Sequence, residues 1–551
     1  MQIVVPMSGF GERFRRAGYT TPKPLIQVEG KPIIAHVVDL FDPLSKFIFV
    51  VNQEHLEDKS LRLLDILRGI APASDVVAIA PHRLGPVHAC LSAIDLLEPD
   101  GEVFVNYADF SCVWNFQDFI TDARKRKLHG SVPAYRGFHP HSGGSTNYAY
   151  IQEDSLRLQA IREKQPFTNQ KTEEYASTGG YYFQSASLMI DYFKRLVLED
   201  HSVNGEFYVS SAFDLMAKDL LDVGVYEITH FMQWGTPEDL DEYKYWSNTF
   251  RELSEWRESP VSVASTGPTL VLASGRGERF ASAGYKVPKP ALSISGKKLL
   301  DQVCRAAEIN KPISISLTEN HLAWFRDMNQ SRLVKFSSTT AGQAVSTRRL
   351  LDLSGIPVKD FFTVLPSDTL FADKSNQLSA LIEDIIGKPF VIPWISTPTP
   401  FALKTPKNFG WLVETNNQIL SYIKDIPPHS NAKVLTGAFT FSSPEHFRIL
   451  YEELFSRKIM VNGEYYLDSF VELAQAKGFA VRLFQPTLSV SLGTPYEFET
   501  FRYWQGAFEQ WASHPYSLEL DPFITDIDVE KVRKELKITK HQPGEWHGDF
   551  E

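Results

Sequence analysis

The chain has 551 residues, more than one hydrophobic core normally serves, so at least two domains are expected. Hydrophobic residues make up 43% and charged residues 22%, as in an ordinary globular protein, while 67 acidic against 56 basic side chains give a net charge of -11. This charge disfavours nucleic acid as a partner, because nonspecific attraction to phosphates needs an excess of cations.

Cysteine use and hydropathy favour a cytoplasmic protein. Cys90, Cys112 and Cys304 are too few and too scattered for a disulfide framework or a zinc site. The first predicted strand begins at Gln2, which leaves no room for a signal peptide, and no apolar run approaches the length of a membrane span. We therefore expect no membrane partner.

A buried strand is predicted at residues 2–7, and the glycine-rich segment after it occurs twice. Residues 9–24 and 275–290 share eleven of sixteen positions at a constant offset, which indicates a tandem duplication. The second copy begins with a matching strand at 269–273. We predict a first domain at 1–254, a linker at 255–267, a second domain at 268–510 and a C-terminal extension at 511–551 that belongs to neither copy.

The repeated segment has the residue types that a polyphosphate site needs. Gly9 and Gly11 let the backbone turn sharply and offer bare amides to an anion, and Arg13 and Lys23 add cations. The second copy supplies the equivalent residues: Gly275, Gly277, Arg279 and Lys289.

Two other nucleotide motifs are excluded, and a third family matches. The dinucleotide fingerprint fails because Phe14 and Phe280 replace its third glycine, and the Walker pattern lacks its hydroxyl residue. Gly-x-Gly-x-Arg followed by Pro-Lys-Pro resembles the signature of sugar-1-phosphate nucleotidyltransferases, such as the glucose-1-phosphate thymidylyl- and cytidylyltransferases. Glu12 and Glu278 stand where those enzymes usually carry Ser or Thr, so we expect a divergent branch.

Apolar strands alternate with helical patterns through the first half of each copy. In the first copy we predict helices at 31–41 and 54–70 and strands at 46–52, 75–80 and 102–107. This alternation is typical of crossover units and a mostly parallel sheet wrapped by helices. With the resemblance, it implies an α/β protein made of two tandem Rossmann-like, mixed-sheet domains of glycosyltransferase-A-like fold, with helices on both faces.

Another glycine turn precedes a predicted helix at Gly85, and Gly342 stands at the equivalent position in the second copy. The resemblance implies that this turn lies against the nucleotide base. A helix N-terminus with Pro86 in its first turn explains the same residues.

Aspartates follow the strand at 102–107 and its counterpart. Asp109 and Asp368 are expected at the carboxyl edge of the sheet, where open α/β sheets bind ligands, and one carboxylate with phosphate oxygens suits Mg²⁺. The alternative interpretation is that each aspartate caps a helix. The resemblance places a second metal ligand at Gln233, where the second copy has Ser491.

From residue 131 the pattern changes to short strands, predicted at 131–138, 147–152, 157–162 and 174–184, as expected of an acceptor-binding half. By resemblance, lysine in a Glu-Lys segment meets the sugar phosphate, small residues let the sugar approach, and glutamates meet hydroxyls. The residues assigned are Glu163, Lys164, Gly180, Glu206, Lys424, Gly437 and Glu464. A solvated turn at 163–164, and helix capping by Glu206 and Glu464, stay open. Ile423 precedes Lys424 in the second copy, so we expect the two copies to take different acceptors.

The expected reaction joins an NTP and a sugar 1-phosphate, giving a nucleotide sugar and pyrophosphate. Arg13 and Arg279 would hold the leaving phosphates, and Lys23 and Lys289 the α-phosphate. Alternatively, one copy is a regulatory or scaffold domain. A glycosyltransferase is a third reading, although neither Asp109 nor Asp368 begins an Asp-x-Asp motif. The sequence leaves open which base the NTP carries, with CTP preferred. It also leaves open the acceptor and whether the protein forms a homo-oligomer.

Overall fold

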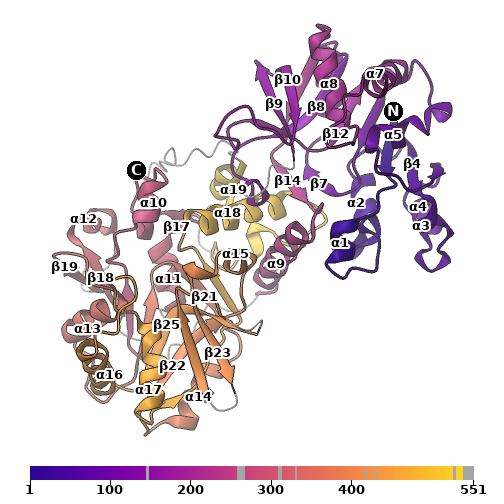
Figure 1. The fold of residues 1–551 in the computed structure, drawn as a ribbon. Coiled ribbons are helices and arrows are strands. Elements are labelled where there is room, and N and C mark those ends of the chain that lie inside the picture. The colour runs from indigo at the N-terminus through magenta and orange to yellow at the C-terminus, as the bar shows by residue number, and fades with distance from the viewer. Residues whose placement is uncertain are drawn as a thin grey trace. The chain divides into compact units, whose positions relative to one another are not determined.

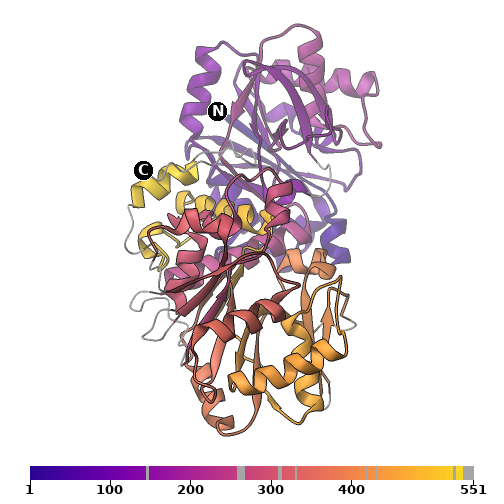
Figure 2. The ribbon, with the colours of Figure 1, turned by 90° about the vertical axis from the view of Figure 1, so that its left-hand side faces the viewer.

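The structure is a computed structural model that describes residues 1–143, 148–256, 267–307, 313–328, 332–415, 418–427, 431–524 and 529–537. Most of the predicted linker (257–266) and the end of the predicted extension (538–551) lie outside the described residues. The chain divides into two compact units, coloured indigo to magenta and red to orange for most of their length (Figures 1 and 2). In the described ranges, no helix is both long and apolar enough to cross a membrane.

The first unit combines Met1–Ser247 with Tyr503–Pro515 and a short piece that begins at Leu536. Its main sheet has the strand order β11 (Tyr175–Ser177), β9 (Ala149–Asp154), β10 (Arg157–Glu163), β13 (Val223–Glu227), β8 (Gly130–Tyr135), β12 (Gly180–Phe183), β6 (Val103–Asn106), β1 (Gln2–Met7), β4 (Lys46–Asn52) and β5 (Asp75–Ile79). The strands β6, β1, β4 and β5 run parallel, and β12 joins this half to a mixed half through antiparallel pairs.

Helices cover both faces of this sheet, because its central strands are apolar on both sides. Along β1, Ile3 and Val5 pack into one core and Val4 into the other. The first core receives α2 (Ile33–Val38), α4 (Leu63–Ile70) and α6 (Phe116–Lys125); the second receives α5 (Pro86–Leu91), α7 (Ala186–Leu198) and α8 (Val209–Lys218). The expected two-sided α/β layering is confirmed in this unit.

The second unit combines Asn248–Arg502 with Tyr516–Glu535. Its sheet has the order β19 (Leu333–Phe336), β18 (Ile313–Thr318), β15 (Thr269–Leu272), β20 (Phe362–Pro366), β25 (Lys433–Phe441), β22 (Phe390–Ser396) and β26 (Ala480–Val481), with β23 (Gly410–Thr415) and β24 (Gln418–Ile423) paired beside β25. Here β15 lies between parallel neighbours, as β1 does, and β25 pairs antiparallel with β20, as β12 does with β6. Helices α13 (Gln343–Ser354), α16 (Pro444–Ser456) and α17 (Phe470–Ala476) pack on one core.

Three predicted elements differ from the structure. The predicted helix 54–70 is two helices, α3 (Gln53–Glu57) and α4, because Asp58 caps a short 3-10 turn and Arg62 adopts a left-handed φ of 48°. The predicted strand 174–184 breaks into β11 and β12 at Gly179, where φ is 96°. The predicted helix 31–41 shortens to α2, since Lys31–Pro32 form a small strand, β3.

A small two-stranded sheet adjoins the end of each central strand. In the first unit β7 (Phe110–Val113) pairs with β14 (His230–Gln233), and in the second β21 (Thr369–Ala372) pairs with β27 (Leu488–Ser491). Helices α9 (Pro237–Ser254) and α18 (Pro495–Gln510) follow them. These ladders bring the Gly-Thr-Pro segments to the aspartates after β6 and β20.

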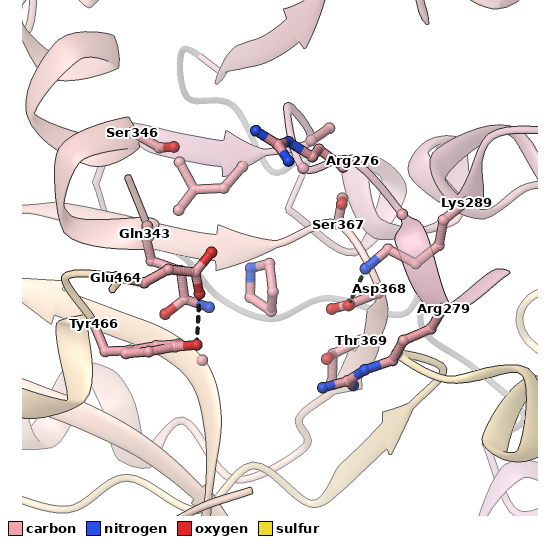
Figure 3. A pocket seen from close by; sticks show the side chains of 18 of the residues that line it. Arg276, Arg279, Lys289, Gln343, Ser346, Ser367, Asp368, Thr369, Glu464 and Tyr466 are labelled. Carbon is pink, nitrogen blue, oxygen red and sulfur yellow. Dashed lines mark hydrogen bonds and ion pairs between the residues drawn. The ribbon is translucent and has the colours of Figure 1, made fainter. Parts of the chain in front are cut away.

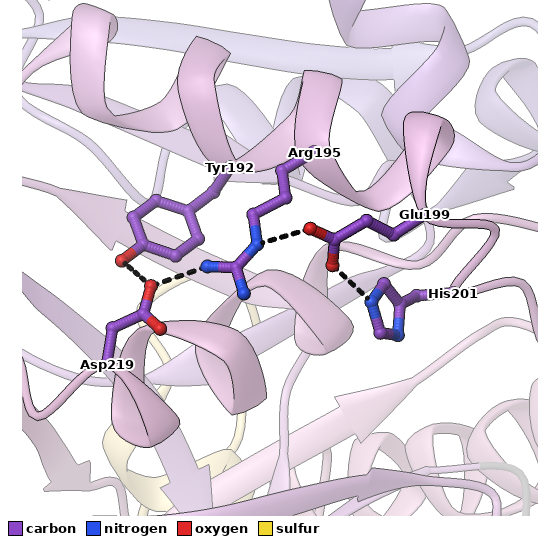
Figure 4. A network of polar contacts seen from close by, with 5 residues as sticks. All are labelled: Tyr192, Arg195, Glu199, His201 and Asp219. Carbon is purple, nitrogen blue, oxygen red and sulfur yellow. Dashed lines mark hydrogen bonds and ion pairs between the residues drawn. The ribbon is translucent and has the colours of Figure 1, made fainter.

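An exposed polar network joins the ends of α7 and α8 (Figure 4). Arg195 lies between Glu199, at 3.0 Å, and Asp219, at 2.6 Å, while Tyr192 donates to Asp219 and His201 contacts Glu199. Because exposed ion pairs contribute little stability, we regard this network as a surface connection between helices rather than a site.

Candidate active sites

The glycine turns have the backbone conformation that their sequence predicts. Gly11 precedes α1 (Glu12–Arg16) with φ 63°, and Gly277 precedes α10 (Glu278–Ser282) with φ 65°. A side chain at such a left-handed position is strained, so glycine suits both turns. Each turn follows the carboxyl end of the strand that the repeat begins with, β1 or β15.

A lysine and an aspartate from distant parts of the sequence meet beside each turn. Lys23 Nζ lies 2.8 Å from Asp109 Oδ2, and Lys289 Nζ lies 2.6 Å from Asp368 Oδ2. Burial alone would raise the pKa of Asp368, but Lys289 outweighs it and holds that pKa below its usual value. The second unit therefore keeps an ionised carboxylate at this position.

The cavity in the first unit has a volume of about 690 Å³. Eight of the predicted site residues line it: Gly9, Gly11, Glu12, Arg13, Lys23, Gly85, Asp109 and Glu206. Tyr107, Tyr208 and Arg83 also line it and were not predicted from the sequence. The nucleotide half of the predicted site is thus assembled around one opening.

The cavity in the second unit has a volume of about 720 Å³ (Figure 3). Nine predicted residues line it: Gly275, Gly277, Arg279, Lys289, Gly342, Asp368, Lys424, Gly437 and Glu464. Figure 3 shows Arg279, Lys289 and Asp368 together on one side and Glu464 with Tyr466 across from them. Arg276, Asp468 and Glu497 also line this cavity and were missed.

Gly85 and Gly342 allow a close backbone contact. Their φ values are 85° and 106°, and an added β-carbon would lie 2.7 Å from the Phe207 backbone or 2.6 Å from the Tyr465 backbone. Phe207 N donates to Leu84 O, and Tyr465 N donates to Ala341 O. The glycines therefore let the loops carrying Glu206 and Glu464 dock against the turns.

The predicted second metal position lies beside the first in both units. A β-carbon at Gly235 would lie 2.6 Å from Gln233 Nε2 and 3.1 Å from Asp109 Oδ2, so these two side chains converge there. At Gly493 the neighbours are Asp368 Oδ2, at 3.2 Å, and Ser491 Oγ, at 3.6 Å. Gln233 itself does not line the cavity.

Glu497 adds a carboxylate to the second unit. Its side chain is 5% exposed, and Oε2 accepts from Thr494 Oγ1 at 2.8 Å. Oε1 has no hydrogen-bond partner among the described residues, and burial raises the pKa of this carboxyl. The sequence signal was a Thr-x-x-Glu segment, which marks a helix start as readily as a site.

Of the acceptor residues predicted in the first unit, Glu206 lines the cavity, whereas Glu163, Lys164 and Gly180 do not. Lys164 Nζ donates to the Tyr208 hydroxyl at 2.5 Å, and Glu163 Oε2 accepts from Ser210 at 2.6 Å. Neither Glu163 nor Lys164 lines the cavity, whereas Tyr208 does. Gly180 is also outside the lining, because it is buried in β12 with Phe104 ring atoms 2.9 Å from the position of a β-carbon.

A family model and several known proteins match part of the chain. Residues 4–239 match the model of the nucleotidyl transferase family. The bifunctional protein GlmU of Paraburkholderia phymatum is 26% identical over 226 residues, covering 40% of this chain and 46% of that protein. GlmU of Ralstonia pickettii is 26% identical over 227 residues, covering 40% and 45%. The chain spans less than half the length of these curated relatives.

Solved structures are also similar to part of this chain, at lower sequence identity. A nucleoside-diphosphate-sugar pyrophosphorylase from Vibrio cholerae is 18% identical, covering 44% of this chain and 98% of its own, with a TM-score of 0.37. The inositol-1-phosphate CTP transferase from T. maritima is 16% identical, covering 44% and 93%, with a TM-score of 0.34. Residues 4–239, the part of the chain that matches this family model, have a mixed α/β fold.

Proposed function

We propose that the protein is a sugar-phosphate nucleotidyltransferase that joins an NTP to a sugar 1-phosphate, or a similar phosphomonoester, and releases pyrophosphate. The proposal includes the second unit as a second nucleotidyltransferase domain. The observation that carries it is the lysine–aspartate pair beside a glycine turn, at 2.8 Å in one unit and 2.6 Å in the other. The product would serve polysaccharide or glycan synthesis.

Such a transfer needs positioned charges rather than a covalent protein nucleophile. The acceptor phosphate oxygen attacks the α-phosphorus in line, the bond to the β-phosphate oxygen breaks, and pyrophosphate leaves. Arg13 would bind the departing phosphates, and Lys23 would stabilise charge at the α-phosphate. Gly9 and Gly11 would donate backbone amides. Arg279 and Lys289 would act in the same way in the second unit.

Mg²⁺ fits the donors in both units, because it prefers oxygen ligands and takes the rest from water and phosphates. Asp109 and Gln233 would hold it in the first unit, and Asp368, Ser491 and Glu497 in the second. The ion would neutralise charge on the phosphates. Since Lys23 already neutralises Asp109, a metal ion there adds unbalanced positive charge unless the triphosphate comes with it. We therefore expect metal and nucleotide to bind together.

The test is a panel of four NTPs against several sugar 1-phosphates, with pyrophosphate detection on the full chain. Lys23→Ala and Lys289→Ala together should abolish pyrophosphate release, each site losing on the order of a hundredfold or more. Lys31→Ala and Lys335→Ala, at exposed lysines paired with Asp39 and Glu319, serve as controls. Normal turnover by the double variant contradicts the proposal. The panel also identifies the base, for which CTP is our first candidate.

A second candidate is that the second unit binds a nucleotide sugar and regulates the first. The shorter side chain of Ser491 at the position of Gln233 favours it. Two working sites leave partial activity after either single lysine substitution, whereas a regulatory second unit leaves Lys23→Ala inactive.

A further inference from the structure

Each unit has one buried carboxylate near the end of an equivalent strand, but at a different sequence position. Glu163 ends β10 opposite Ala149, and Ile423 ends β24 opposite Gly410. Lysine follows in both, as Lys164 and Lys424. Two residues after the tyrosines at 208 and 466, the first unit has Ser210 and the second has Asp468. Three aligned positions therefore change together, from Ala149, Glu163 and Ser210 to Gly410, Ile423 and Asp468.

In the first unit the carboxylate comes from the strand. Glu163 Oε2 accepts a 2.6 Å hydrogen bond from Ser210 Oγ, and burial raises the pKa of Glu163. Ala149 fits at the position opposite Glu163, because here the carboxylate belongs to the strand itself. The serine hydroxyl stabilises the buried group from the helix side.

In the second unit the carboxylate belongs to a helical segment instead of the strand. Asp468 lies in a short 3-10 helix, Leu467–Ser469, is 7% exposed and lines the cavity together with Lys424. A β-carbon at residue 410 would lie 2.1 Å from Asp468 Oδ2, so an alanine like Ala149 has no room there. Ile423 removes the strand carboxylate. Gly410, Ile423 and Asp468 thus belong together: Asp468 replaces the carboxylate that Ile423 lacks, and Gly410 leaves room for it.

The carboxylate of Asp468 also lacks the partner that Glu163 has. Across the described ranges no side chain donates a hydrogen bond to Asp468, whereas Ser210 donates to Glu163. Burying a carboxylate is costly, and an apolar residue would fill the same place more cheaply. A retained acceptor group on a cavity wall, beside a lysine, is suited to a ligand that brings its own donors.

We propose that Asp468 is the acceptor-selecting residue of the second unit: it accepts hydrogen bonds from hydroxyls of a phosphorylated sugar whose phosphate Lys424 binds. This rests on the proposed function of the second unit. Because Asp468 lines its cavity whereas Glu163 does not, the two units offer different groups to a sugar's hydroxyls and select different sugar phosphates.

The test uses the full chain with Lys23→Ala, so that turnover reports on the second unit. Asp468→Asn should lower kcat/KM for the sugar phosphate by a hundredfold or more, while calorimetry shows unchanged binding of a non-hydrolysable NTP with Mg²⁺. Asp425→Asn in this background, at an exposed position, is the matched control and should leave the second unit unaffected. Unchanged acceptor kinetics in Asp468→Asn, or an equal loss of NTP binding, overturns the inference.

A transplant and a binding assay separate this inference from the proposed function. Gly410→Ala, Ile423→Glu and Asp468→Ser together rebuild the first unit's arrangement and should shift acceptor preference toward that of the first unit. Direct binding of hexose 1-phosphates and glycerol 3-phosphate is measured by calorimetry without NTP. Binding that depends on Asp468 without any pyrophosphate release refutes the proposed function and keeps the inference. Binding that is absent, or equal in Asp468→Asn, refutes the inference.

Discussion

The carboxyl of Asp468 has a pKa of about 6, because burial outweighs the attraction of Lys424. An aspartate in an unfolded chain titrates near about 3.9. The folded state therefore binds this proton more tightly than the unfolded state does. The resulting stabilisation is fully present below about pH 4 and is lost as the pH rises through about 6.

Asp468→Asn should remove this pH dependence, since asparagine stays neutral. Relative to the unsubstituted chain, the variant should gain up to about 2 to 3 kcal/mol in free energy of unfolding between pH 4 and pH 7, following from a shift of about two pKa units. Urea unfolding, followed through the transition of the second unit, measures it. Asp425→Asn, at an exposed position, should show no such change. A constant difference between Asp468→Asn and the unsubstituted chain at both pH values contradicts the prediction.

Single residues were predictable where a strand end fixed their place. Lys23 and Asp109 follow strands that were expected to end at the carboxyl edge of the sheet, and the structure pairs their side chains there. Asp468 could not, since nothing in one copy alone shows that a helix residue faces a strand residue. Comparing the copies gives the missing signal: Ile423 loses the carboxylate that Asp468 supplies. The roles of all these residues stay predictions.

At the level of elements, the start of α18 combines a helix cap with a cavity wall. Thr494 Oγ1 accepts from Glu497 N and donates to Oε2, which leaves Oε1 for another partner. In the first unit Thr236 and Asp239 make the same reciprocal contacts with a side chain one methylene shorter. A Thr-x-x-Asp or Thr-x-x-Glu segment is typical of a helix start, and only the structure shows that Glu497 also reaches the cavity.

Glu497→Gln should separate these two roles, because glutamine can still cap the helix but carries no charge. We expect Mn²⁺, used as a probe for Mg²⁺ with a non-hydrolysable NTP, to bind the second unit at least tenfold more weakly, as measured by calorimetry in the Lys23→Ala background. Glu238→Gln, at an exposed position in the first turn of α9, controls for charge at a helix start. Unchanged Mn²⁺ affinity with an unchanged thermal transition assigns Glu497 to capping alone.

Element boundaries follow the strength of the local signal. The apolar runs of β1 and β4 have the predicted ends, because a central strand is apolar on both faces and little else is. The break between α3 and α4 was missed, since the capping by Asp58 and the left-handed Arg62 interrupt a segment that otherwise has a helical pattern. Strong periodicity does not reveal a single residue that ends a helix.

At the level of the whole molecule, the first unit is completed by residues from far along the chain. The Tyr503 hydroxyl accepts from Phe231 N at 2.8 Å and donates to Phe231 O at 2.7 Å. The Trp511 ring packs on His36 and Trp234, with centroids 5.2 and 5.9 Å apart. From sequence alone these residues fell at the end of the second domain and in the extension, because the repeat cannot show which core a later segment joins.

A fragment of residues 1–254 should therefore be less stable than the first unit of the full chain. Its buried Trp234 and the backbone of Phe231 lose their partners, and an unsatisfied buried backbone group costs about 1 to 3 kcal/mol. Thermal unfolding by circular dichroism should show a lower midpoint, which a peptide of residues 495–515 partly restores. The same peptide with Tyr503→Phe and Trp511→Ala should not restore it. An equal midpoint for the fragment contradicts the prediction.

The late position of Tyr503–Pro515 also has a consequence for biosynthesis. A ribosome makes the chain from its amino end, and domains generally fold in the order in which they emerge. Here the unit that begins at Met1 lacks part of its core until residue 515 has been translated. A transcript cut short after the first repeat would therefore yield a first unit without part of its core.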